Sequence, residues 1–138
     1  MKTLPFFLGL FALAMSPLRA DEKTPASTTS SVQDVTPAEA EKLIKENPKL
    51  VVLDVRTPDE FAKGHIPGAK NIDFFEDDFA KKVGALDPAT PLIVHCGSGK
   101  RSTQALGAFK DKQTVYHLNE GFGAWVKAGK PVEEGTKK

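Results

Sequence analysis

The residues best able to do chemistry lie in one short segment, Cys96-Gly97-Ser98-Gly99-Lys100-Arg101-Ser102, which holds the only cysteine of this 138-residue chain. The apolar run before it, residues 92–94, predicts a strand, and residues 102–110 are expected to form a helix. The two glycines allow the backbone to turn with positive φ, so that several N–H groups converge on one point. Such a bowl of N–H groups binds anions and stabilises a thiolate. The segment therefore predicts a reactive Cys96 thiolate.

Charges and hydroxyls beside the cysteine fit the same chemistry. Lys100 and Arg101 lie at the expected start of the helix, where a basic residue costs roughly 0.3–1 kcal/mol unless a negative group offsets it. A Cys96 thiolate or an anionic substrate would be that group. Ser102 is expected to cap the helix and to offer its hydroxyl to the sulfur. The alternative is a surface loop that carries a buried, inert cysteine.

Strand and helix signals alternate along the rest of the chain. Thr36-Pro37-Ala38-Glu39 reads as a capping box with proline at the first helical position, and Pro48 is expected to end that helix near residue 47. Residues 50–53 form a continuous apolar run, typical of a strand buried on both faces. Further elements are expected at residues 57–63, 70–72, 92–96, 114–118 and 121–128, with Phe74, Phe75, Phe79 and Val83 on one helical face. This alternation predicts an α/β fold with a mostly parallel sheet.

Asp54 and Arg56 come directly after the strand expected at residues 50–53. Ligands of parallel sheets bind at the carboxyl ends of the strands, and Cys96 lies at such an end. We expect Asp54 and Arg56 to support the site rather than to contact substrate. Arg56 could also pair with Glu60, four residues further on, or reach into the bowl.

The three histidines, His65, His95 and His117, are scattered through the chain. His95 directly precedes Cys96 on a strand, so its side chain is expected on the opposite face of the sheet, which disfavours a Cys–His dyad. The other two are read as residues with local hydrogen bonds. There is no Cys-x-x-Cys pair, so we expect no metal site and no cofactor.

The first residues have the pattern of an export signal. Lys2 precedes an apolar run over residues 4–15, which is too short to span a bilayer and fits the core of a secretory signal that ends at Ala20. We expect a signal peptide at 1–20, a flexible polar linker at 21–31 and one domain at 32–138. The expected location is the periplasm, without a membrane span after cleavage; an uncleaved anchor is the alternative. The formal net charge of +1 gives no reason to expect nucleic acid as a partner.

Four segments together resemble the single-domain rhodanese family, the thiosulfate sulfurtransferases, of the exported, periplasmic type. They are Asp54-Val55-Arg56 with Glu60-Phe61, Gly64-His65-Ile66-Pro67-Gly68-Ala69 with Asn71-Ile72, the Cys96–Ser102 loop, and Gly121-Phe122-Gly123-Ala124-Trp125. The resemblance implies a single rhodanese-like α/β domain with a mostly parallel, five-stranded sheet flanked by helices. The chain differs from the family pattern at one place, where it has Glu120-Gly121 and the family often has paired glycines.

The resemblance also implies a mechanism and its partners. Cys96 would take a sulfane sulfur from a small anionic donor, thiosulfate or mercaptopyruvate, and carry it as a persulfide to a thiol or cyanide, or to a protein acceptor. The loop begins like mercaptopyruvate-type enzymes and continues, with Lys-Arg-Ser, like thiosulfate-type loops, so the donor stays open. The residues expected to bind substrate are Gly97, Ser98, Gly99, Lys100, Arg101 and Ser102.

Other functions remain to be weighed against sulfur transfer. A cysteine phosphatase or arsenate reductase places arginine six positions after the cysteine, whereas this chain has serine there and its arginine at five. A persulfide carrier with one dedicated partner, or a rhodanese-like binding module, would use the same fold without rapid turnover.

Overall fold

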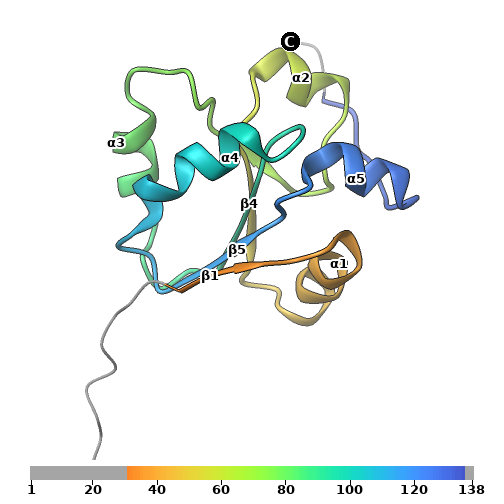
Figure 1. The fold of residues 1–138 in the computed structure, drawn as a ribbon, viewed down its shortest axis with the longest axis horizontal. Coiled ribbons are helices and arrows are strands. Elements are labelled where there is room, and N and C mark those ends of the chain that lie inside the picture. The colour runs from red at the N-terminus through yellow and green to blue at the C-terminus, as the bar shows by residue number, and fades with distance from the viewer. Residues whose placement is uncertain (1–30, 136–138) are drawn as a thin grey trace, which may run out of the picture.

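A computed structural model of the chain describes residues 31–135. Its strands form one sheet in the order β1-β5-β4-β2-β3, and every neighbouring pair is parallel (Figure 1). The five strands are β1 (Ser31–Asp34), β2 (Val51–Asp54), β3 (Lys70–Asn71), β4 (Leu92–His95) and β5 (Thr114–His117). The predicted α/β fold with a parallel five-stranded sheet is confirmed.

The helices begin where local signals start them. Thr36 and Thr57 each cap a helix in a complete capping box, with proline at the first helical position. The helical elements are α1 (Pro37–Glu46), α2 (Pro58–Lys63), α3 (Phe79–Gly84), α4 (Lys100–Ala105), the 3₁₀ helix η1 (Leu106–Phe109) and α5 (Gly121–Lys127). Figure 1 shows α3 and α4 on one side of the sheet and α1 and α5 on the other.

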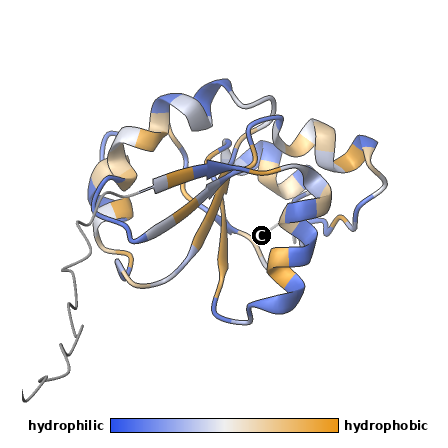
Figure 2. Ribbon diagram, turned by 60° about the horizontal axis from the view of Figure 1, so that its bottom comes forward, coloured by the Kyte–Doolittle hydropathy of each residue, from blue (hydrophilic) through white to orange (hydrophobic). Residues whose placement is uncertain are grey.

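The sheet separates two apolar cores, because β2 and β4 are hydrophobic on both faces (Figure 2). Val94, Cys96 and Phe109 belong to the core under α3, α4 and η1. Ile93 and Trp125 belong to the core under α1 and α5. Consecutive residues of β4 thus alternate between the two cores, which places the Cys96 side chain on the α4 side of the sheet.

Two details of the expected elements are wrong. The helix after the cysteine loop begins at Lys100, not Ser102, because Gly99 adopts φ 95° and ends the turn earlier; it tightens into η1 at Leu106. Phe74 and Phe75 do not share a helical face with Phe79 and Val83, since both lie before α3, and the exposed fraction of Phe75 is 66%.

The predicted signal peptide at 1–20 and residues 21–30 of the predicted linker lie outside the described residues. Ser31, placed last in that linker, is the first residue of β1. Within residues 31–135, no helix is long and apolar enough to cross a membrane.

Candidate active site

Parallel strands bring their carboxyl ends to one edge of the sheet, where the cysteine loop starts. Cys96 follows β4 directly, and the backbone folds back over it through residues 97–99 into α4. The Gly99 N–H donates to Cys96 Sγ at 3.0 Å. The whole residue is buried, so this sulfur is enclosed by the loop that holds it.

Several donors favour the thiolate of Cys96. Burial alone raises the pKa of the Cys96 thiol, because a charge is costly in an apolar surrounding. Hydrogen bonding by residues 98, 99 and 102 outweighs the effect of burial, so the net pKa of the Cys96 thiol lies below the ordinary 9.0. The expected bowl of N–H groups is thus present around the sulfur.

The first turn of α5 holds the loop from behind. The N–H of Phe122 donates to the Cys96 carbonyl at 2.8 Å, and that of Gly123 donates to the Gly97 carbonyl at 3.0 Å. Gly121 (φ 72°) sits so close that a Cβ there would lie 2.5 Å from the Gly97 oxygen. Sequence reasoning missed this support, although the Gly121-x-Gly123 spacing was its visible signal.

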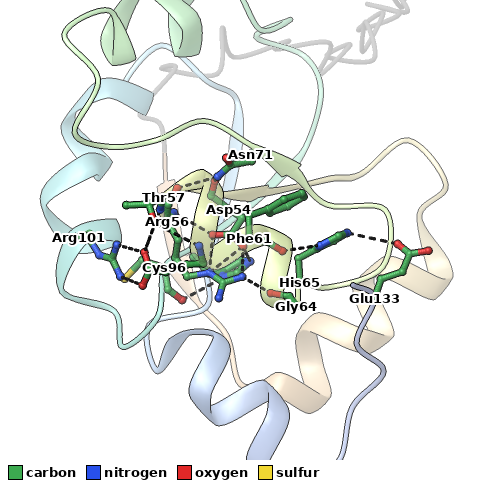
Figure 3. A network of polar contacts seen from close by, with 12 residues as sticks. Asp54, Arg56, Thr57, Phe61, Gly64, His65, Asn71, Cys96, Arg101 and Glu133 are labelled. Atoms are coloured by element: carbon green, nitrogen blue, oxygen red, sulfur yellow. Dashed lines mark hydrogen bonds and ion pairs between the residues drawn. The ribbon is translucent and has the colours of Figure 1, made fainter. Parts of the chain in front are cut away.

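Asp54 and Arg56 form a buried ion pair beneath the loop (Figure 3). Arg56 Nη2 donates to Asp54 Oδ2 at 2.6 Å and to the Gly64 carbonyl at 2.7 Å. The guanidinium also lies over the Phe122 ring, 4.1 Å from its centroid. These contacts tie β2 to α5, which fits a supporting position; the alternative pairing of Arg56 with Glu60 is wrong.

Glu60 instead pairs with Arg101 from the cysteine loop. Arg101 donates through both terminal nitrogens, at 2.7 and 2.9 Å, a bidentate contact that ties α2 to α4. The hydrogen bonds from Arg101 lower the pKa of Glu60 to about 2. A Cβ on Gly97 would lie 3.3 Å from Arg101 Nη2, so the Glu60–Arg101 ion pair lies against the backbone of the cysteine loop.

The two basic residues of the loop therefore differ. Arg101 has the Glu60 carboxylate as an ionic partner, which the sequence did not predict, and its expected contact with substrate stays a prediction. Lys100 is exposed and makes no ion pair within residues 31–135. Lys100 is thus the cation of this loop that remains available to an anion.

The histidines take three different positions. His65 stacks on Phe61, and its Nδ1 lies 3.0 Å from the Phe61 carbonyl oxygen, in line with a local role. His95 packs toward Phe122 on the opposite face from Cys96, as expected, and its burial lowers its pKa. His117, at the end of β5, is buried and contacts the Ser102 hydroxyl.

Ser102 lies inside the first turn of α4 rather than at its cap. Its hydroxyl is 3.1 Å from the Gly99 carbonyl and 2.8 Å from His117 Nε2. The hydroxyl donates to the Gly99 carbonyl, and its expected contact with the sulfur stays a prediction. Among residues 31–135 there is no group of three or more histidine, cysteine or acidic side chains that could hold a metal ion.

Comparison with known proteins adds the family context. The rhodanese-like domain family matches residues 36–128. Thiosulfate sulfurtransferase GlpE of Pseudomonas aeruginosa (strain LESB58) is 36% identical over 99 residues, which cover 70% of this chain and 86% of that relative. The uncharacterized protein YibN of Escherichia coli (strain K12) is 34% identical over 113 residues, covering 79% of this chain and 78% of YibN. A rhodanese-related protein from Thermoplasma volcanium shares the fold with a TM-score of 0.64 and 27% identity, over 73% of this chain and 97% of that one.

Proposed function

Since this chain belongs to the rhodanese family, we propose that it is a sulfurtransferase in which Cys96 carries the transferred sulfur as a persulfide. The observation that supports this most is the enclosure of Cys96 Sγ by N–H donors that lower the pKa of its thiol. A thiolate is the attacking form of cysteine, and a loop of N–H groups can hold both it and the negative persulfide.

The proposed reaction has two half-steps. The Cys96 thiolate attacks the outer sulfur of thiosulfate; the new S–S bond forms as the old one breaks, and the bonding electrons leave with sulfite. A thiolate or cyanide then attacks the outer sulfur of the persulfide, and the electrons return to Cys96. Sulfur is passed on at each step, so no external oxidant or reductant is needed.

Thiosulfate is the donor we propose first, in keeping with the named activity of the GlpE relative. Lys100, which has no ionic partner among the described residues, would attract the donor and offset the charge of the departing sulfite. Arg101 would act differently, by fixing the loop through Glu60. Mercaptopyruvate is the other donor to be tested.

Steady-state formation of thiocyanate from thiosulfate and cyanide tests the function. We expect ping-pong kinetics in the wild type and no turnover in Cys96→Ser. Turnover with mercaptopyruvate alone would change the donor but keep the mechanism. A protein that takes up one sulfur without turning over small acceptors would be a carrier, and hydrolysis of a phosphate ester would instead support the phosphatase reading.

We also propose that the chain is exported and cleaved after Ala20, on the strength of Lys2 and the apolar run at residues 4–15. The protein expressed in a Gram-negative host should then appear in the periplasmic extract with Asp21 as its first residue. Retention of Met1 on protein found in the membrane fraction would support the uncleaved anchor instead.

A further inference from the structure

The backbone carbonyl of the cysteine is held by two donors. His95 Nδ1 lies 3.0 Å from the Cys96 carbonyl oxygen, and the Phe122 N–H donates to the same oxygen at 2.8 Å. The His95 and Phe122 rings are stacked, with their centroids 6.2 Å apart. Since the side chains of His95 and Cys96 lie on opposite faces of the sheet, the cysteine is fixed from both: its carbonyl by His95 and Phe122, and its sulfur by the Gly99 N–H at 3.0 Å.

The contact with the carbonyl determines which ring nitrogen of His95 carries the proton. A carbonyl oxygen only accepts hydrogen bonds, so Nδ1 is the donor, and Nε2 of the neutral ring keeps its lone pair. Burial lowers the pKa of His95 and outweighs the nearby Asp54 carboxylate, so the ring stays neutral. Asp54 Oδ2 lies 3.8 Å from Nε2, too far for a hydrogen bond. The other charged or titratable groups near the ring are Arg56, His117 and Cys96.

Packing alone does not explain a histidine at position 95. Among the buried side-chain nitrogen and oxygen atoms of residues 31–135, His95 Nε2 is the one without a hydrogen-bond partner. A buried polar atom without a partner destabilises the folded protein, and an apolar side chain like those at residues 92–94 of the same strand would avoid that cost. The hydrogen bond from Nδ1 to the Cys96 carbonyl is what the histidine provides and an apolar residue would not.

We propose that His95 is a positioning residue for sulfur transfer: its Nδ1–H holds the Cys96 carbonyl, so that the loop N–H groups stay directed at the sulfur. The peptide unit between Cys96 and Gly97 starts the loop, and its orientation sets where the following N–H groups lie. Two donors on its carbonyl fix this peptide, which keeps the Gly99 N–H against Sγ. With Phe122 as the single donor, the loop gains freedom and the thiolate loses part of its stabilisation. His95 acts through the backbone and exchanges no proton with the sulfur.

Two substitutions at position 95 separate this role from packing. His95→Leu removes the donor together with the unpaired Nε2, whereas His95→Asn keeps an N–H donor at the place of Nδ1 on a smaller side chain. We expect His95→Leu to be as stable as the wild type in urea and His95→Asn to be less stable. The order reverses for the thiolate: the thiol pKa should rise by roughly one unit in His95→Leu and change little in His95→Asn.

The thiol pKa is measured by the ultraviolet absorbance of the thiolate, each variant against its own Cys96→Ser baseline, because the chain has one cysteine. Steady-state kinetics should show a lower kcat in His95→Leu at pH values below the thiol pKa, with the KM for thiosulfate unchanged. His65→Leu is the matched control, since His65 Nδ1 also lies 3.0 Å from a backbone carbonyl, that of Phe61, outside the cysteine loop. It should leave the thiol pKa unchanged.

An unchanged thiol pKa in His95→Leu would overturn the role of His95, and so would an equal rise in His95→Asn, because the donor would then not matter. Nitrogen NMR of the wild-type protein gives a test that needs no variant to fold. We expect the proton of the neutral His95 ring on Nδ1, with a resonance that shifts as the Cys96 thiol ionises. A proton on Nε2 instead would equally overturn this role.

This role of His95 rests on the proposed function only in taking Cys96 as the nucleophile. The titration and the NMR experiment use no sulfur donor, so their results are independent of whether the protein loads with thiosulfate. A protein that loads with sulfur but whose thiol pKa does not respond to the donor at position 95 would keep the function and lose the role of His95. A thiol that responds to that donor but takes up no sulfur would keep the role and overturn the function.

Discussion

At the level of single residues, the cysteine loop depends on how closely its backbone lies to neighbouring segments. Gly99 has φ 95°, and a Cβ on it would lie 1.7 Å from the Asn119 carbonyl oxygen. Gly107, in η1, has nothing within 4 Å of the same added atom. A side chain at position 99 would therefore clash with its surroundings, whereas one at position 107 would not, so Gly107 serves as the control for Gly99.

We expect Gly99→Ala to lower the free energy of unfolding by at least about 2 kcal/mol and to abolish sulfur transfer, since the loop must shift away from the sulfur. Gly107→Ala should leave both within error or slightly stabilise the protein. Urea unfolding and thiocyanate formation measure the two effects. Full activity and stability in Gly99→Ala would show that the loop is not held as described.

The Asp54–Arg56 pair gives a second prediction at this scale. Asp54→Asn leaves the buried Arg56 guanidinium without its counter-charge, so we expect a loss of about 3 kcal/mol or more in urea unfolding. Replacing both residues, as Asp54→Leu with Arg56→Met, should cost less than Asp54→Asn alone, because no charge is then stranded. A double variant less stable than the single one would contradict this account of the pair.

At the level of elements, the Glu60–Arg101 contact joins α2 to α4. The pKa of Glu60 falls from 4.5 to about 2 on folding, so its charged form stabilises the folded state. That contribution is complete above pH 4.5 and is lost as the pH falls toward 2. Glu60→Gln should therefore lower the urea midpoint at neutral pH, and its difference from wild type should shrink through this range.

Glu46→Gln is the matched control, because Glu46 lies 3.9 Å from Lys42 in an exposed pair on α1 and should contribute little at any pH. The same Glu60→Gln variant should raise the KM for thiosulfate by loosening the loop that receives it. A difference in stability that persists unchanged to pH 2 would assign the effect of Glu60 to packing rather than to charge.

Sequence patterns predicted the elements whose signals are local. The capping box at Thr36 predicted the start of α1, and the short helix expected at residues 57–63 corresponds to α2, because both signals are read within a few residues. The start of α4 was misplaced because the turn at Gly99 is shaped by its approach to Asn119, twenty residues away in the chain.

In the candidate site, too, the local features could be predicted from the sequence and the long-range contacts could not. The loop around Cys96 was visible as a strand, two glycines and a helix start. The partner of Arg101 was not, because Glu60 lies 41 residues away and its spacing from Arg56 suggested the wrong pair. The partners of His117, Asp34 and Ser102, were not predicted either, because they come from elements whose arrangement only the fold establishes.

At the scale of the whole molecule, the parallel sheet explains how so short a chain assembles its site. Asp34, Asp54, Cys96 and His117 come from or directly follow four different strands, and parallel pairing puts all four at one edge. Helix α4 then follows the cysteine loop directly, and the first turn of α5 binds the backbone carbonyls of that loop. The sheet is the scaffold, and the proposed chemistry is confined to its carboxyl end.

The central claim is that Cys96 carries a transferred sulfur atom, and intact mass spectrometry tests it most directly. The protein is measured before and after incubation with thiosulfate, beside Cys96→Ser, and again after cyanide. We predict a gain of one sulfur atom in the wild type, its removal by cyanide and no gain in the variant. An unchanged wild-type mass with both thiosulfate and mercaptopyruvate, or an equal gain in Cys96→Ser, would contradict the account.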